Sequence, residues 1–280
     1  MLEITLKQII TEKKKQGVSK ILILNYLKEY IQYLVLSLIY NHKKFKKLTF
    51  KGGSCLRICF NLPRLSENLD FDCSKSQFKG SLLKELKEYL SYEIKNKYFA
   101  NLEIKIQSTK RLYLKFPFLH RLGLAEKSES DKLYVKIETA HQLLPCAKFE
   151  STPISKFGFN FIAYHYDLPS LMAGKINALL NKVWFKRKKQ EIDIKGRDFY
   201  DLFWFLKNNV KPNFKTLEKT ADIKNEKQLK EILSKRLKKV ATPQKLAYDL
   251  RNFIPEQEFV NGFAKNYPEI IKKYLTHSSN

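Results

Sequence analysis

The spacing of apolar residues predicts helices and strands in the first part of the chain. Residues 19–43 and 81–98 repeat apolar positions at the 3.6-residue period of a helix. Apolar and polar positions alternate at 102–109, 111–118 and 132–139, the pattern of a half-buried strand. These three successive strands predict one antiparallel or mixed sheet with helices beside it.

Shorter apolar runs predict the rest of this sheet. Strands are expected at 48–50 and 69–73, on either side of a short helix that Ser54 caps and Pro63 ends. A further strand is expected within 157–166. The first part of the chain therefore contains a strand–helix–strand unit as well as the three alternating strands.

The strand pattern largely ends at residue 167, and helical periodicity replaces it. The predicted helices are 168–183, 197–209, 225–240, 242–254 and 269–275, with Pro212, Pro243, Pro255 and Pro268 at their boundaries. We therefore expect an α+β protein. A mixed sheet with flanking helices forms domain 1–166, and a helical bundle forms domain 167–280.

The charge balance favours an anionic partner. The chain has 280 residues, and 53 Lys and Arg against 28 Asp and Glu leave a net charge of +25. Such a charge attracts nucleic acid or an anionic membrane surface. A lysine-rich composition that no partner has selected would produce the same charge, so the charge alone does not decide between these alternatives.

The cysteine and apolar patterns favour a soluble, cytoplasmic protein. Cys55, Cys59, Cys73 and Cys146 are too few for a disulfide framework and form no C-x-x-C pair. The most apolar run, 21–40, is interrupted by a lysine and a glutamate, and no signal-peptide pattern begins the chain.

The strand at 69–73 carries two carboxylates one residue apart. Successive strand residues point to opposite faces, so Asp70 and Asp72 lie on one face while Leu69 and Phe71 enter the core. Two acids this close repel each other unless a cation lies between them. Mg²⁺ binds through one or two carboxylates and substrate phosphates, so the pair fits a Mg²⁺ or Mn²⁺ site that a nucleoside triphosphate completes. A solvated strand face also carries acids, and that is the simpler explanation.

The turn before the short helix is suited to phosphate. Gly52 and Gly53 allow close backbone approach, the helix that follows offers free N–H groups, and Ser54 adds a hydroxyl. The chain contains neither G-x-x-x-x-G-K-[ST] nor G-x-G-x-x-G, which disfavours a P-loop enzyme and a nicotinamide-dependent enzyme.

Together, GGS at 52–54 and RLSENLDFD at 64–72 resemble the signature of the DNA polymerase β-like nucleotidyltransferase superfamily, and specifically of the AbiEii/AbiGii-type toxin family. Arg64, Ser66, Asp70 and Asp72 match the family's R-x-S-x-D-[IL]-D segment, whereas Asn68 stands where the family commonly has an acid. The resemblance implies that Asp70 and Asp72 bind the metal and that the turn, Arg64 and Ser66 bind the nucleotide.

Two later segments continue the resemblance. Residues 171–178 are similar to the family's lysine-bearing helix, and residues 196–202 to its R-D-x-x-D-L helix. Lys175 lies at the edge of an apolar helical stripe, where a buried ammonium requires an anion; a lysine that extends to solvent is the alternative. The resemblance implies that Lys175 binds phosphate and that Asp198 or Asp201 orients it. An ordinary ion pair of Asp201 with the arginine at 197 is the alternative.

A third metal carboxylate is usual in this superfamily. Glu138 is the candidate because it alternates with buried Val135 and Ile137, and Glu103 is the weaker candidate. A solvent-facing glutamate would show the same alternation. The resemblance implies a nucleotidyltransferase-like fold and Mg²⁺-dependent transfer of NMP from an NTP to an RNA such as a tRNA. It also implies that the protein is the toxin of a toxin–antitoxin or phage-defence pair.

Two other functions remain open at the level of the sequence. One is a nucleotidyltransferase that modifies small molecules of the antibiotic type, for which the basic charge is a poor match because those acceptors are cations. The other is a non-catalytic RNA-binding protein that keeps the fold. An antitoxin protein is a further expected partner, and no membrane is expected.

Overall fold

The structure is a computed structural model that describes residues 2–74, 81–98, 100–181 and 194–276, with the backbone alone for 238–240. It contains two compact units. Unit 1 consists of Met1–Leu143 and Phe149–His165, and unit 2 of Leu144–Lys148 and Tyr166–Asn280. The division into domains 1–166 and 167–280 stays a prediction, because compact packing does not show that either part folds alone.

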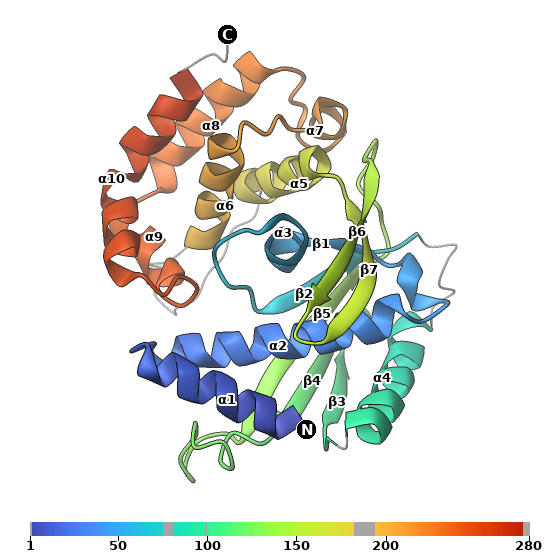
Figure 1. The fold of residues 1–280 in the computed structure, drawn as a ribbon. Coiled ribbons are helices and arrows are strands. Elements are labelled where there is room, and N and C mark those ends of the chain that lie inside the picture. The colour runs from blue at the N-terminus through green and yellow to red at the C-terminus, as the bar shows by residue number, and fades with distance from the viewer. Residues whose placement is uncertain (1, 75–80, 99, 182–193, 277–280) are drawn as a thin grey trace. The chain divides into compact units, whose positions relative to one another are not determined.

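A mixed sheet forms the centre of unit 1 (Figure 1). Its strands are β1 (Thr49–Lys51), β2 (Asn68–Asp72), β3 (Glu103–Gln107), β4 (Arg111–Pro117), β5 (Lys132–Ala140), β6 (Phe149–Lys156) and β7 (Phe159–Tyr166). Within the described residues their order is β3-β4-β5-β2-β1-β7-β6. β2 pairs antiparallel with β1 and parallel with β5. The α+β class and the mixed sheet are therefore confirmed.

The inner face of this sheet is the core of unit 1. Phe50 of β1 and Phe71 of β2 stack with ring centroids 5.3 Å apart, and both are fully buried. The helices of unit 1 are α1 (Leu2–Lys15), α2 (Lys20–Tyr40), α3 (Gly52–Phe60) and α4 (Leu82–Tyr98), with the 3-10 turn η1 (Phe45–Lys47). Tyr40 of α2 contacts Phe71, and α1 runs beside α2 (Figure 1). Alternation along β2 consequently leaves Asp70 and Asp72 on the opposite face.

In unit 2, the structure describes helices and the short segment Leu144–Lys148. The helices are α5 (Leu168–Asn181), α6 (Gly196–Lys207), α7 (Phe214–Ala221), α8 (Glu226–Val240), α9 (Pro243–Leu250) and α10 (Gln257–Thr276). α6 packs against α5, α9 and α10, and α10 also packs against α8. Aromatic contacts join α6 to α10, since the rings of Tyr200 and Phe203 both lie within 5.5 Å of Phe263.

The segment Leu144–Lys148 belongs to unit 2 because its backbone is bonded there. The hydroxyl of Thr216 donates to the carbonyl of Pro145 at 2.8 Å, and the side-chain amide of Asn213 donates to the carbonyl of Cys146 at 2.8 Å. The predicted linear division at residue 166 does not include this contribution.

The structure corrects the prediction that Pro268 lies at a helix boundary. α10 runs through Pro268 from Gln257 to Thr276. Proline inside a helix removes one hydrogen bond and costs about 3 kcal/mol. Buried contacts on both sides offset this cost, because Phe263 and Tyr267 pack ring to ring and Ile271 is buried one turn further on.

Among the described α-helices and strands, α1, β6 and α7 have no counterpart in the prediction. β6 is mostly exposed and contains a proline, so it lacks the alternation that marks a half-buried strand. α7 has only two turns, in which Thr216 and Leu217 are the buried residues. The predicted helix 168–183 ends in the structure at Asn181, and residues 182 and 183 lie outside the described residues.

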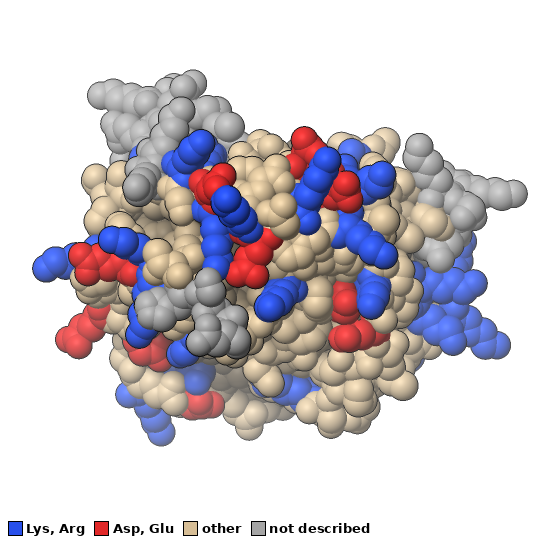
Figure 2. All heavy atoms as spheres, turned by 90° about the horizontal axis from the view of Figure 1, so that it is seen from above, with Lys and Arg blue, Asp and Glu red and all other residues tan. Residues whose placement is uncertain are grey.

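The described surface carries charges of both signs. On the face shown in Figure 2, Lys and Arg side chains are interspersed with Asp and Glu side chains and do not form one patch. The net charge of +25 therefore does not by itself identify which surface would bind an anionic partner. None of the described helices has the length and apolar content needed to cross a bilayer.

Candidate active site

The strand register places the predicted carboxylates on one face of the sheet. Asp70 of β2 pairs with Glu138 of β5, and Asp72 pairs with Ala140. Residues paired directly across neighbouring strands point to the same side, so Asp70, Asp72 and Glu138 share the face opposite Phe71. Glu103 lies on β3, at the edge of the sheet and separated from β2 by β4 and β5. The structure thus places Glu138, and not Glu103, beside the pair.

Asp72 and Glu138 already form ion pairs with basic side chains. Lys51 Nζ lies 2.6 Å from Asp72 Oδ1, and Asp72 is only 1% exposed. Glu138 forms ion pairs with Lys136 at 2.6 Å and with Arg111 at 3.0 Å. Burial raises the pKa of Glu138, but the hydrogen bonds and charges of Lys136 and Arg111 outweigh it, so the pKa lies below its usual value.

The buried thiol beside this pair is inert at neutral pH. Burial and then the negative charge of Asp72 raise the pKa of Cys73 to about 11. A thiolate is the nucleophilic form of cysteine, so Cys73 offers no nucleophile to this site.

The donors match a hard divalent cation in kind. Asp70 and Asp72 supply carboxylate oxygens from one strand face, which is the ligand type that Mg²⁺ and Mn²⁺ prefer. Within the described residues, no group of three His, Cys, Asp or Glu side chains is arranged to hold a metal ion. The structure therefore offers a two-carboxylate set that phosphate oxygens would complete, with Glu138 engaged by its own cations.

The glycine turn lies directly against Asp70. Lys51 is paired with Asp70 across β1 and β2, so Gly52 follows immediately beside that carboxylate. Gly52 has φ +77°, and a Cβ atom there would lie 2.5 Å from Asp70 Oδ2. A Cβ on Gly53 would lie 2.5 Å from Arg64 Nη2 and 3.0 Å from Ser66 Oγ. Both glycines are required by close approach, and the turn and the acid pair are neighbours.

Ser54 has a different role from the expected helix cap. α3 already begins at Gly52, and Lys51 is its N-cap residue. The Ser54 hydroxyl donates to the carbonyl of Asn68, and Ser54 is fully buried. The prediction of a Ser54 cap is therefore wrong, because the hydroxyl joins the first turn of α3 to the start of β2.

Arg64 and Ser66 pack against Gly53 of the turn. Arg64 is 1% exposed, and its guanidinium donates to the carbonyl of Leu65 at 2.9 Å while it contacts the Cα side of Gly53. A buried arginine in this position fixes the path of the loop that leads to β2. The structure places both residues next to the turn, and their predicted contact with nucleotide stays a prediction.

Further residues support this loop and carried no motif in the sequence. Arg57 of α3 forms an ion pair with buried Glu29 of α2 at 3.2 Å and donates to the carbonyl of Pro63 at 2.7 Å. Gln32 donates to the carbonyl of Ser66 at 3.0 Å. Glu29 was the feature of the sequence that could have indicated this contact. It lies on an apolar helix, and a buried acid requires a partner.

In unit 2, the predicted lysine and its acids are in contact. Lys175 Nζ of α5 lies 2.6 Å from Asp201 Oδ2 and 3.0 Å from Asp198 Oδ1, both on α6. Asp201 is fully buried, and Lys175 is 17% exposed. The ammonium group of Lys175 is therefore paired with two carboxylates. The alternative, a lysine side chain that extends into solvent, is not what the structure shows.

Arg197 contacts an acid on another helix. It pairs with buried Asp249 of α9 at 3.3 Å and lies over the ring of Phe253 at 4.1 Å. A Cβ on Gly196 would lie 2.3 Å from the carbonyl oxygen of Leu246, so glycine permits α6 to begin against α9. Arg197 therefore has a carboxylate partner on another helix, far from it in the sequence.

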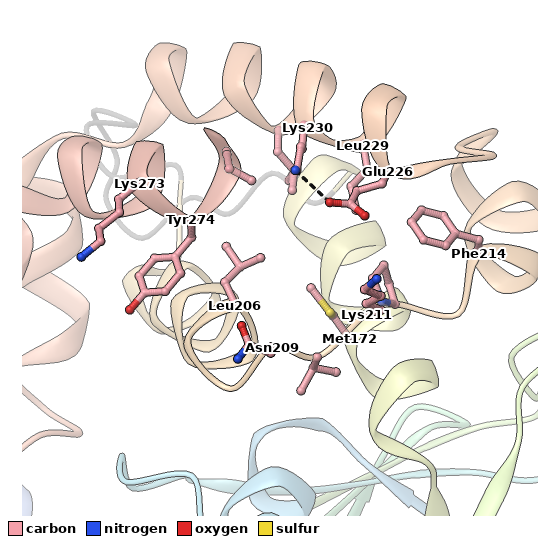
Figure 3. A pocket seen from close by; sticks show the side chains of 14 residues that line it. Met172, Leu206, Asn209, Lys211, Phe214, Glu226, Leu229, Lys230, Lys273 and Tyr274 are labelled. Atoms are coloured by element: carbon pink, nitrogen blue, oxygen red, sulfur yellow. Dashed lines mark ion pairs between the residues drawn. The ribbon is translucent and has the colours of Figure 1, made fainter. Parts of the chain in front are cut away.

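Unit 2 also contains a cavity of about 260 Å³ (Figure 3). Met172, Leu206, Leu229 and Phe214 give it largely apolar walls, and Glu226 pairs with Lys230 at its α8 side. None of the site residues predicted from the sequence lines this cavity.

Unit 1 thus combines a mixed sheet with two carboxylates beside a glycine turn, a combination that suits nucleotidyl transfer. The family model described as nucleotidyl transferase AbiEii toxin, type IV toxin–antitoxin system, matches residues 34–280. The chain therefore belongs to this family and is a nucleotidyltransferase of a toxin–antitoxin type. Membership in a toxin–antitoxin family implies an antitoxin partner.

Two solved structures from Helicobacter pylori are similar to the chain. JHP933 is 18% identical, with 90% of this chain and 91% of that chain covered and a TM-score of 0.47. A protein described as a candidate nucleotidyltransferase is 19% identical, with 90% and 97% covered and a TM-score of 0.42. Because both scores are below 0.5, the assignment depends on the family match alone. A comparison with curated proteins found no significant match.

Proposed function

We propose that this nucleotidyltransferase moves NMP from an NTP to an RNA acceptor, such as the 3′ end of a tRNA, in a Mg²⁺-dependent reaction. The observation that carries the proposal is the contact of the Gly52 turn with the Asp70 carboxylate. A backbone turn suited to phosphate and a carboxylate pair suited to a divalent cation are then adjacent, as transfer of a phosphoryl-type group requires.

Asp70 and Asp72 would hold the cation, and Glu138 is the additional carboxylate. A bound Mg²⁺ would supply positive charge that neutralises the charge of the substrate phosphates. The chain's own contribution is positional, because β2 fixes both carboxylates on one face and Lys51 balances the charge of Asp72. Asn68, where the family commonly has an acid, is not one of these ligands.

The first turn of α3 would bind the triphosphate. Its backbone N–H groups and the positive end of its dipole favour anions, and Gly52 and Gly53 permit close approach. The Ser54 hydroxyl already donates to Asn68, so Ser54 would act through its backbone. Arg64 and Ser66 would hold the shape of the turn.

For the second part of the chain we retain two proposals, the first from the helical periodicity and the second from the resemblance. Helices α5–α10 form a helical bundle domain, and Lys175 supplies an ammonium for phosphate charge. Support for Lys175 is its orientation by Asp198 and Asp201, whose carboxylates fix the side chain in one position.

An RNA acceptor agrees with the net charge of +25, because a polyanion benefits from a basic protein whereas a cationic small molecule does not. NTPs and RNA are both cytoplasmic, and we propose the same location for the protein.

The test incubates the protein with each labelled NTP, Mg²⁺ and total RNA, beside Asp72→Asn and the control Glu150→Gln, an exposed acid of β6. Label that enters RNA with Mg²⁺, is lost in Asp72→Asn and persists in the control is the expected result. Equal labelling by Asp72→Asn, or label found only on a small molecule that resists RNase, would overturn the proposal.

A further inference from the structure

The outward face of β3, β4 and β5 continues the face that carries the acid pair. The inward residues Leu112, Leu114 and Val135 are fully buried, so their neighbours along each strand point outward. Paired positions then form rows across the sheet. One row runs Gln107, Arg111, Glu138, Asp70, Lys51, and the next runs Lys105, Tyr113, Lys136, Asn68.

We call the outward face of β3–β5 the strand platform and define it by Lys105, Arg111, Tyr113, Lys115, Tyr134 and Lys136. The outward positions of these three strands carry more basic than acidic side chains. The outward positions of the three strands hold five cations, including Lys132, and two acids, Glu103 and Glu138. Each acid is shared by two cations, Glu103 by Lys115 and Lys132 at 2.6 and 2.7 Å. Three positive charges remain in excess.

Two tyrosines stand among these cations. Tyr134 is 41% exposed, and Tyr113 is partly exposed between Lys105 and Lys136 in its row. A polar face alone is ordinary for a sheet with one side in water. A positive face with exposed aromatic rings has the composition that binds single-stranded nucleic acid, in which bases stack on rings and cations contact phosphates.

The position of the platform relative to the acid pair also fits an acceptor. β1, which leads into the glycine turn, lies on one side of β2, and β5 and β4 lie on the other. In nucleotidyl transfer the attacking oxygen and the leaving phosphate are in line on opposite sides of the phosphorus. If the turn holds the leaving phosphates, the acceptor approaches from the side of β5.

We propose that the strand platform binds the single-stranded end of the acceptor RNA. Tyr113 and Tyr134 stack on bases, and Lys105, Arg111 and Lys136 contact phosphates. The direction of approach rests on the proposed function, whereas RNA binding by this surface can be measured without nucleotide or metal.

The experiment measures binding of a labelled hairpin RNA with a single-stranded 3′ end, and of the same hairpin without it, in EDTA and without NTP. Tyr113→Ala/Tyr134→Ala should weaken binding of the first RNA at least tenfold, while Tyr113→Phe/Tyr134→Phe keeps it, because base stacking depends on the ring. Lys105→Gln should lower the dependence of log Kd on log salt by about 0.7.

Matched controls separate the platform from nonspecific effects. Tyr92→Ala removes a tyrosine of α4 that is 67% exposed, and Lys84→Gln removes an exposed cation of α4. Neither change should alter the affinity by more than twofold. The proposal is overturned if the tyrosine-to-alanine pair binds RNA as tightly as the wild type, if the phenylalanine pair loses binding as well, or if the blunt hairpin binds equally well.

The same preparations distinguish failure of the platform from failure of the proposed function. Asp72→Asn should bind the hairpin normally and fail to label it. Binding that depends on the tyrosines, with no labelling by the wild type, would refute the proposed transfer to RNA and support the platform as an RNA-binding surface. Normal labelling with unchanged affinity and KM in the tyrosine-to-alanine pair would refute the platform alone.

Discussion

The charged clusters of the two units are held in place by different parts of the chain. In unit 1, strand pairing of β1, β2 and β5 aligns Asp70 with Lys51 and Glu138, so the main chain sets the geometry. In unit 2, side-chain ion pairs between α5 and α6 set the position of Lys175. A cluster that the main chain holds should be sensitive to backbone changes, and one that side chains hold should be sensitive to loss of a single partner.

The largest effect on stability is expected from Lys175→Met. This change leaves Asp198 and fully buried Asp201 without the ammonium that both contact, and removing one partner of a buried ion pair costs about 3 to 5 kcal/mol. Both tryptophans of the chain, Trp184 and Trp204, follow residue 166. Urea unfolding monitored by tryptophan fluorescence therefore measures the loss.

Lys51→Met is the matched change in unit 1. Only Asp72 loses an ammonium there, and the strand register remains, so we expect a loss of about 1 to 3 kcal/mol, followed by circular dichroism. Equal losses for the two variants, or a loss below about 1 kcal/mol for Lys175→Met, would contradict the distinction between the clusters.

The second effect in size tests the main chain of unit 1 through Gly52→Ala. A residue with a Cβ at φ +77° costs about 1 to 2 kcal/mol, and contact of that Cβ with Asp70 at 2.5 Å adds to the cost. Because the contact displaces a proposed metal ligand, we expect nucleotidyl transfer to fall about 100-fold. Labelling rates and unfolding midpoints provide the two measurements.

Gly158→Ala is the control for Gly52→Ala. Gly158 has φ +80° but nothing within 4 Å of an added Cβ, so only the conformational cost applies. Transfer should be unchanged in this control. A comparable loss of activity in both variants would show that the turn matters through general stability and not through its contact with Asp70.

The local parts of the acid site were predictable from the sequence, and the non-local parts were not. Alternation along 69–73 was sufficient to place Asp70 and Asp72 on one face, because side-chain direction in a strand depends on the strand alone. Strand order decided between Glu138 and Glu103, and the sequence does not contain the β2–β5 register in any local pattern.

Side-chain partners far apart in sequence were the other limit. Ser54 has the residue type of a helix cap, yet the approach of Asn68 gives its hydroxyl a different acceptor. Arg197 has an acid four residues later, and packing adds Asp249 of α9 as a carboxylate partner. Local spacing indicates which pairs can form, and tertiary packing selects among them.

The third effect tests whether unit 2 also depends on its backbone, through Gly196→Ala. An added Cβ would lie 2.3 Å from the carbonyl oxygen of Leu246, so α6 and α9 must separate, at a cost of about 1 to 3 kcal/mol. Gly262→Ala in α10 is the control, since nothing lies within 4 Å, and alanine should stabilise that helix by about 0.5 to 1 kcal/mol. A loss larger than that of Lys175→Met would reverse the comparison, because backbone approach would then dominate unit 2.

The smallest effect concerns Glu138. Unlike the rest of the unit 1 cluster, its carboxylate is stabilised by side-chain ion pairs, with Arg111 and Lys136. Its folded pKa lies below the unfolded value near 4.3, so its stabilisation is present above that pH and is lost as the pH falls through the folded pKa. With the side chain 32% exposed, the contribution should stay below about 1 kcal/mol.

Unfolding in EDTA between pH 3 and 7 should show Glu138→Gln less stable than the wild type at pH 7, with the difference shrinking toward pH 3. Arg111→Gln/Lys136→Gln should flatten the same dependence, since it removes both cations. A difference that grows as the pH falls would mean that burial, and not the two cations, dominates this carboxyl group.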